Sequence, residues 1–238
     1  MIIKEPVRFY FSFRSPFSGI ALHRVMQCLD YQDVAFTLMP VWPDIIFGGH
    51  MDNPTNNLFK LIYIFSDAAR QADVAGLNSE HLRGIAARLP LPDDVDYSAK
   101  KLGVSMGDEP WHIPHAAVHY AASQGRAWEF SHEVFMRRFN YDGKGAADVM
   151  DPDVVGQIAR SVGLDGDQAA VAHESDDIRA KIDDVRRRGE RDGVFGVPFC
   201  VLEREGSMEA FWGNDHLEYL LRAIRGTDQL PVLNMRSE

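Results

Sequence analysis

The stretch FYFSFRSPFSG, residues Phe9 to Gly19, joins an aromatic run to a break made of serine and proline. Val7 to Phe13 is rich in aromatic and β-favouring residues, which predicts a strand. Pro16 suits the first position of a helix and Ser15 suits its N-cap, so we expect Phe17 to Leu29 to be helical. The four residues SPFS have the spacing of a C-x-x-C redox motif, with hydroxyls in place of the two thiols.

Outward from this stretch, Val34 to Pro40 predicts a second strand, so the chain opens β-α-β, the start of an α/β sheet. Towards the other end, the pattern predicts a helix, two strands and a helix at Asp176–Arg191, Phe199–Glu203, Met208–Trp212 and Asp215–Arg225. Between them it predicts helices at Asn57–Ala75, Ser79–Arg88, Pro114–Gln124, Glu129–Phe139 and Pro152–Val162, with a loop at Leu89–Pro110. We therefore expect residues 1–45 and 176–238 to form one α/β domain, and residues 46–175 to form a helical insertion.

The composition indicates an ordinary globular protein, because 45% of the 238 residues are hydrophobic and 25% are charged. We expect no membrane segment, because no apolar run reaches the roughly 18 residues that a spanning helix needs. The net charge of −10 disfavours nucleic-acid binding, which requires a basic face. The first residues lack a signal-peptide pattern and only two cysteines occur, Cys28 and Cys200, so we expect a cytoplasmic protein with structural thiols.

Three histidines, His112, His115 and His119, raise the question of a metal site, because two of them are four residues apart on a predicted helix. There is no H-E-x-x-H motif and no evident third ligand, so we expect no metal and regard them as surface or pocket histidines. No glycine-rich nucleotide motif occurs. The basic run at Arg186–Arg188 is interpreted as a solvated helix face.

Three motifs in order carry a family resemblance: FYFSFRSPFSGIA, then Gly196-Val197-Pro198 before a strand, then the sequence FWGND before the last helix. Together they resemble the DsbA-like branch that contains 2-hydroxychromene-2-carboxylate isomerases and kappa-class glutathione transferases. The resemblance implies an α/β, thioredoxin-like fold with a large all-helical insertion, glutathione as the cofactor, and a homodimer, since family members are often dimers.

The resemblance also implies roles for the first two motifs. Ser15 matches the active serine of the family, which donates a hydrogen bond to the glutathione sulfur. Val197 and Pro198 match a cis X-Pro peptide, where the backbone before the proline pairs with the cysteine backbone of glutathione, in the manner of an added strand.

The third motif and one middle stretch supply further candidates through the resemblance. Asp215, with Asn214, matches an acid at the start of the last helix that holds the γ-glutamyl ammonium group. The stretch NPTNNLFK resembles a family segment whose asparagine and lysine hold the ligand, which makes Asn56 and Lys60 candidates, with Asn53 as an alternative alignment. We take Lys60 as the candidate cation for a substrate carboxylate. The long stretch between residues 77 and 111 departs from the family pattern, so it leaves the second substrate open.

Each of these residues also has a structural interpretation. A serine hydroxyl is a poor nucleophile without a base, whereas a helix N-terminus favours an anion such as a thiolate, so Ser15 suits a donor role. Ser15 could equally serve only as a helix cap. Pro198 could be an edge-strand or turn proline, and Asp215 could simply complement the last helix.

The leading functional hypothesis is a glutathione-dependent cis-trans isomerase that acts on a conjugated aromatic keto acid, in aromatic compound degradation, by reversible thiolate addition. Three alternatives stay open. The first is a kappa-like glutathione transferase or peroxidase. The second is a DsbA-like disulfide oxidoreductase that lacks its cysteines, and the third is a non-enzymatic binding module. The first two hypotheses share glutathione and a small-molecule substrate.

Overall fold

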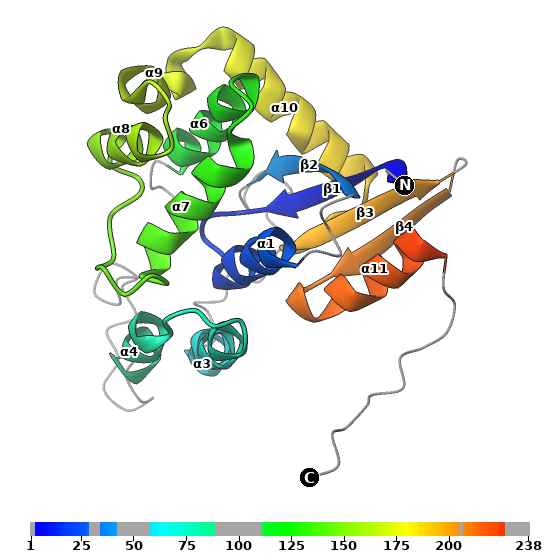
Figure 1. The fold of residues 1–238 in the computed structure, drawn as a ribbon, viewed down its shortest axis with the longest axis horizontal. Helices are drawn as coiled ribbons and strands as arrows, with labels where there is room; N and C mark the ends of the chain where they lie inside the picture. The colour runs from blue at the N-terminus through cyan, green and yellow to red at the C-terminus, as the bar shows by residue number, and fades with distance from the viewer. Residues whose placement is uncertain (1–2, 29–33, 42–57, 89–110, 205–206, 227–238) are drawn as a thin grey trace.

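A four-stranded sheet lies at the centre of the computed structural model, with its strands in the order β2-β1-β3-β4 (Figure 1). β1 (Ile3–Phe11) pairs in parallel with β2 (Val34–Pro40) and antiparallel with β3 (Phe199–Arg204). β4 (Ser207–Trp212) pairs antiparallel with β3 at the edge. The structure describes residues 3–28, 34–41, 58–88, 111–204 and 207–226. Strands from the two ends of the chain thus form one sheet, as the sequence predicts.

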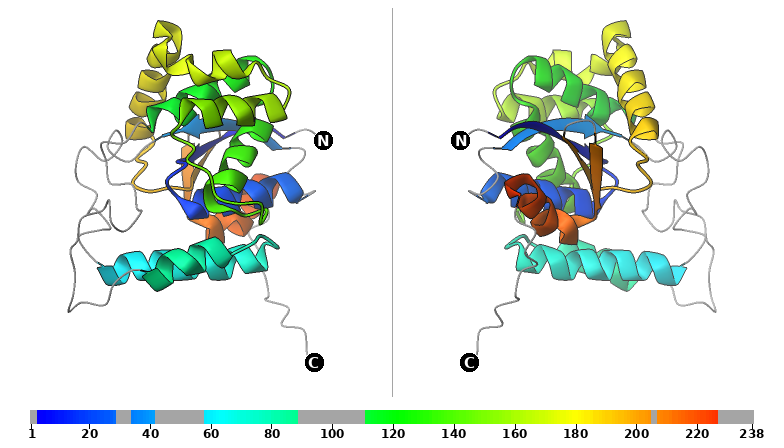
Figure 2. Two further views of the ribbon diagram at one scale, coloured as in Figure 1. Left: turned by 90° about the vertical axis from the view of Figure 1, so that its left-hand side faces the viewer. Right: turned by 90° about the vertical axis from the view of Figure 1, so that its right-hand side faces the viewer.

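Helices cover both faces of this sheet (Figures 1 and 2). α1 (Pro16–Gln27) and α11 (Leu217–Arg225) lie on one face, and α10 (Asp176–Arg191) lies on the other. The alternation of side chains along β1 supplies both interfaces, because successive residues of a strand point to opposite faces. Phe9 belongs to the core that contains α1, whereas Tyr10 belongs to the core that contains α10. Burial on both faces accounts for the apolar and aromatic side chains of Val7, Phe9, Tyr10 and Phe11.

The middle of the chain is helical. Its elements are α3 (Leu58–Val74), α4 (Glu80–Arg88), α6 (His112–Ser123), α7 (Ala127–Phe139), α8 (Pro152–Ser161), α9 (Gly166–Ala170) and the 3-10 turn η3 (Ala172–Glu174). α3 and α4 lie side by side, while α6 to α9 gather at one end of the sheet (Figures 1 and 2). α1 packs against both α3 and α7. Its approach to α7 requires Gly19, because a Cβ atom there would lie 2.8 Å from the Phe135 ring.

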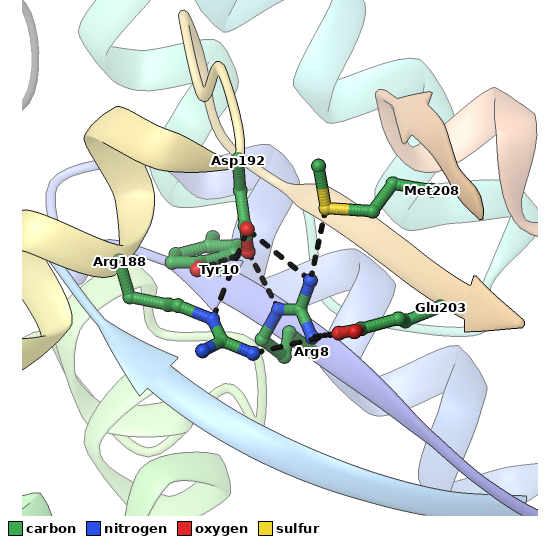
Figure 3. Close-up of polar contacts among 6 residues, drawn as sticks. All are labelled: Arg8, Tyr10, Arg188, Asp192, Glu203 and Met208. Atoms are coloured by element: carbon green, nitrogen blue, oxygen red, sulfur yellow. Dashed lines mark hydrogen bonds and ion pairs between the residues drawn. The ribbon is translucent and has the colours of Figure 1, made fainter. Parts of the chain in front are cut away.

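A cluster of buried charges joins the end of α10 to the sheet (Figure 3). The side chain of Asp192, just after α10, is only 2% exposed and lies 2.5 Å from Nε of Arg8 on β1. The Tyr10 hydroxyl donates to the same carboxylate at 2.6 Å, and Arg8 also contacts Glu203 at 2.6 Å. Burial and the Asp192 hydrogen bond raise the pKa of Tyr10, so the phenol stays a donor. The cluster fixes the point where the chain leaves α10 towards β3.

Arg188 corrects one interpretation of the sequence. The basic run 186–188 was expected to face solvent, but Arg188 points to the buried cluster (Figure 3). It lies 3.8 Å from Asp192 and 3.5 Å from Glu203, with its side chain 39% exposed. A carboxylate on the neighbouring strand, distant in sequence, accounts for the difference.

Several element boundaries differ from the sequence prediction, and three differences bear on the fold. β1 ends at Phe11, because the next residues turn into α1. The last helix is preceded by a 3-10 turn, η4 (Asn214–His216). α9 and η3 were not predicted, since elements of five and three residues are too short to produce a hydrophobic period. The loop predicted at Leu89–Pro110 lies outside the described residues. Within the described ranges, no helix has the length and apolar character needed to cross a membrane.

Candidate functional site

A tight turn at the end of β1 presents Ser15. The N–H of Ser15 donates to the carbonyl of Ser12 at 3.0 Å, which closes the turn. Ser15 has an extended backbone (φ −94°, ψ 114°), and its Oγ accepts the N–H of Ser18 at 3.2 Å. Pro16 occupies the start of the helix. This geometry confirms the predicted N-cap and places the hydroxyl at the N-terminus of α1.

The Ser15 hydroxyl also reaches the segment that leads into β3. Its Oγ donates to the carbonyl oxygen of Val197 at 3.3 Å. The Val197–Pro198 peptide is cis, as the family resemblance implies. The hydroxyl therefore has one acceptor contact within its own helix and one donor contact across the fold.

The third motif is tied to the second by its backbone. The N–H of Gly213 donates to the carbonyl of Pro198 at 2.9 Å. Gly213 has a φ of 102°, a conformation that side-chain-bearing residues rarely adopt, and the following residues form η4. The structure thus brings Ser15, Val197 and Pro198 together. Asn214 and Asp215 follow Gly213, whose backbone contacts Pro198.

Asn214 and Asp215 differ in their surroundings. Asn214 is buried, and its Oδ1 accepts Nη1 of Arg24 on α1 at 3.1 Å. Its Nδ2 donates to Oε1 of Gln71 on α3 at 2.7 Å. By contrast, the side chain of Asp215 is 74% exposed, and its carboxylate lies 3.7 Å from Nδ1 of His216. Asn214 is therefore held as an anchor of the turn, while Asp215 presents a carboxylate to solvent.

The remaining predicted ligands come from the segment at the start of α3. Lys60 lies in the first turn of α3 and is exposed. Asn56 and Asn53 lie outside the described residues. The position of this segment relative to a ligand stays a prediction.

Sequence reasoning missed the residue behind the turn. His115 of α6 is fully buried, rather than a surface or pocket residue, and its Nε2 lies 3.3 Å from the Phe13 nitrogen and 3.4 Å from Ser12 Oγ. Burial lowers its pKa to about 3, although backbone carbonyls at Trp111 and Val41 oppose this change. The ring is therefore neutral at physiological pH. Its only sequence signal was a histidine on an apolar helix face, more than a hundred residues from the turn.

The chemistry available at the turn follows from its position. The dipole at a helix N-terminus stabilises an anion, and a hydroxyl donor adds to that effect. A thiolate placed there would have a lowered thiol pKa. The site suits the binding of a sulfur anion, with the hydroxyl as a hydrogen-bond donor.

The two cysteines lie elsewhere. Cys28 caps the C-terminus of α1, at the opposite end from Ser15, and Cys200 is buried in β3. Burial raises the pKa of the Cys200 thiol, so it is a poor source of thiolate. In the part of the chain that the structure describes, no group of three histidine, cysteine or acidic side chains could hold a metal ion.

The class of protein follows from this fold and from the matching family model. A model described as a DSBA-like thioredoxin domain matches residues 6–225, so the chain belongs to this family. It has a thioredoxin-like fold with helices inserted between β2 and α10. Among curated proteins, none matches this sequence.

Solved structures resemble the chain along most of its length. A 2-hydroxychromene-2-carboxylate isomerase has a TM-score of 0.64 at 21% identity, covering 93% of this chain and 95% of that one. A probable DsbA oxidoreductase from Streptomyces coelicolor has a TM-score of 0.58 at 16% identity, covering 96% and 92%. The cytosolic disulfide reductase DsbM from Pseudomonas aeruginosa has a TM-score of 0.58 at 18% identity, covering 93% and 97%. At these identities the likeness concerns the fold.

Proposed function

We propose that this protein is a glutathione-dependent isomerase of the 2-hydroxychromene-2-carboxylate isomerase type, acting on a conjugated aromatic keto acid. The observation that carries the proposal is the Ser15 hydroxyl at the N-terminus of α1, in contact with the carbonyl of Val197. When bound, glutathione supplies the thiolate that adds to the conjugated carbon and leaves with the same electron pair after rotation about the carbon–carbon bond.

The residues present fit the parts of a γ-glutamyl thiol peptide. The Val197 carbonyl can accept the N–H of a ligand peptide beside β3, as an added strand would require. The exposed carboxylate of Asp215 can accept an ammonium group. By the family resemblance Asn56 and Lys60 are candidates for holding the ligand, with Lys60 as the candidate cation for the substrate carboxylate. The Val197 carbonyl and the Asp215 carboxylate match the amide and the amine of glutathione.

Ser15 would change its donor partner on binding. Without a ligand, its proton lies towards Val197. When a sulfur anion lies beside it, the Ser15 hydroxyl turns from the Val197 carbonyl to donate to the sulfur, and the carbonyl accepts a ligand N–H. Its N-cap contact with Ser18 keeps the oxygen in place during this change. The residue then lowers the pKa of the thiol without acting as a nucleophile.

Thermal unfolding with reduced glutathione tests the cofactor. At about 100 times its dissociation constant, a ligand stabilises the folded state by roughly 2.7 kcal/mol, so we expect a clear rise in Tm. S-methylglutathione serves as the control that retains the peptide and lacks the thiol. An unchanged Tm at millimolar concentrations of both would contradict the proposal.

A kappa-like transferase or peroxidase is the second candidate, because thiolate stabilisation by Ser15 would serve either reaction. Parallel assays with a benzylidenepyruvate and a halogenated aromatic electrophile separate the two. The disulfide reductase DsbM was also solved with GSH, and that structure has a TM-score of 0.55 at 17% identity to this chain. Disulfide reduction is therefore a third reaction to assay. Activity towards insulin disulfides, with none towards the keto acid, would replace the isomerase proposal by a reductase.

A further inference from the structure

Ser12 is the residue on which the shape of the turn before Ser15 depends. Its carbonyl accepts the Ser15 N–H at 3.0 Å, and its N–H donates to Ser18 Oγ at 3.5 Å. Its own Oγ accepts the N–H of Arg14 at 3.3 Å. Ser12 and Ser18 are both fully buried, so water cannot replace these bonds. Any group that fixes Ser12 therefore fixes Ser15.

The tautomer of His115 follows from its contacts. Nδ1 lies 2.6 Å from the carbonyl oxygen of Trp111, and because that oxygen can only accept, Nδ1 carries the proton. Nε2 is then a bare acceptor, and it receives the Phe13 N–H at 3.3 Å. The Ser12 hydroxyl lies 3.4 Å away and can donate to the same lone pair. The Phe13 ring packs on the imidazole, with centroids 4.9 Å apart.

We propose that His115 is a positioning residue that sets the direction of the Ser15 hydroxyl by holding Phe13 and Ser12 through Nε2. The inference rests on the function proposed above, in which Ser15 is the donor to a thiolate. It assigns to α6, part of the helical insertion, a share in organising a site that otherwise consists of thioredoxin-like elements. Loss of the Nε2 acceptor leaves a buried Phe13 N–H without a partner, so the turn must shift to satisfy it.

Three substitutions separate the contacts of the ring. His115→Gln places an amide oxygen where Nε2 accepts, so it can keep the bond from Phe13. His115→Asn keeps a donor near the Trp111 carbonyl but is too short to reach Phe13. His119→Phe is the matched control, because His119 lies one turn further along the same helix, and its buried Nε2 has no hydrogen-bond partner among the described residues.

A thiol introduced by Ser15→Cys reports the geometry without any ligand. Its pKa is obtained from the rate of alkylation against pH, resolved by mass spectrometry from Cys28 and Cys200. At a helix N-terminus we expect it to titrate below the ordinary cysteine value of about 8.5. Adding His115→Asn should raise the pKa by about one unit, a tenfold decrease in the acid dissociation constant of the thiol. Adding His115→Gln or His119→Phe should leave it near the value of Ser15→Cys alone.

An identical pKa with and without His115→Asn overturns the inference, provided circular dichroism shows that both proteins are folded. If His115→Asn does not fold, the protein with Ser15→Cys and His115→Gln decides the question. A pKa of its introduced thiol as high as that of free cysteine overturns the role assigned to the acceptor. Failure of the unmodified protein to bind glutathione is a separate outcome. It removes the proposed function, whereas the thiol measurement still decides whether His115 positions residue 15.

Discussion

The hydroxyl oxygen of Ser15 lies 3.3 Å from the carbonyl oxygen of Val197, a residue 182 positions further along the chain. The contact joins the N-terminus of α1 to the start of β3. In this DsbA-like thioredoxin domain, serines stand at both ends of the C-x-x-C spacing. The contact therefore pairs the hydroxyl that could donate to a sulfur with the carbonyl that could accept the N–H of a bound peptide.

Ser15→Ala should remove both the helix cap and the donor to a thiolate. We expect a loss of about 1 kcal/mol in the free energy of unfolding, as for other N-caps. The thiol pKa of bound glutathione, followed by absorbance of the thiolate, should rise. Ser175→Ala is the matched control, because the Ser175 side chain caps α10 through the N–H of Ile178. It should cost a similar amount of stability and leave the thiol pKa unchanged; the same thiol pKa in Ser15→Ala and the unmodified protein would exclude the donor role.

Asp215→Asn should weaken the binding of glutathione by up to about fivefold, because an exposed ion pair contributes up to about 1 kcal/mol. Cysteinylglycine lacks the γ-glutamyl group, so its affinity should be unaffected. Isothermal titration calorimetry measures both. Glu218→Gln is the control, since Glu218 is an exposed acid in the first turn of α11. Equal losses for the two ligands would show that Asp215 does not hold the ammonium group.

Asp192→Ala should destabilise the fold strongly. It leaves Arg8, whose side chain is 6% exposed, without its buried carboxylate. Breaking one partner of a buried ion pair costs about 3–5 kcal/mol. Urea denaturation measures the change. Asp183→Ala removes an exposed acid from α10 and should leave the midpoint unchanged, so similar midpoints for the two variants would contradict the importance assigned to the cluster.

Stability should fall in mild acid because of buried histidines. Burial lowers the pKa of His119 and of His132 to about 4, and that of His115 to about 3. Unfolded histidine titrates near 6.5, so between about pH 6.5 and 4 the unfolded chain binds protons that the folded chain does not. The free energy of unfolding therefore decreases as pH falls through this range, by up to about 1.4 kcal/mol per pH unit for each group.

His119→Phe tests the origin of this dependence. Removing one such group should reduce the slope of unfolding free energy against pH by about 1 kcal/mol per unit in the same range. Urea unfolding between pH 4 and 7 provides the slope. Ser123→Ala, on the same helix, removes no titratable group and should reproduce the original slope. If His119→Phe also reproduces it, the buried histidine does not cause the acid sensitivity.

The thioredoxin-like part could be predicted from sequence because its signals are local. Ser15 and Pro16 mark the start of a helix after an aromatic strand, and the structure has both features. The short strands Phe199–Arg204 and Ser207–Trp212 follow from apolar runs around a turn. The cis peptide at Val197–Pro198 followed from the family resemblance alone, since a proline by itself favours trans.

The support of the site could not be predicted, because it consists of contacts between distant segments. His115 meets Ser12 across 103 positions, and no periodicity encodes that meeting. Arg188 looked like one of three equivalent surface cations, and only the fold brings it near Glu203. The amide of Asn214 likewise meets Arg24 and Gln71, which lie 190 and 143 positions away in the sequence.

The amide of Asn214 has one more consequence. It connects Arg24 of α1 with Gln71 of α3, a residue 143 positions before it. The turn that presents Asp215 is thus held in part by the inserted helices. Relatives that share the SPFS, VPF and WGND motifs but differ at position 71 would have the same site residues. The turn that carries their acid at position 215 would lack the contact between Asn214 and Gln71. Transplanting the three motifs into another DsbA-like scaffold would therefore not transfer the geometry of this turn unless the glutamine on α3 goes with them.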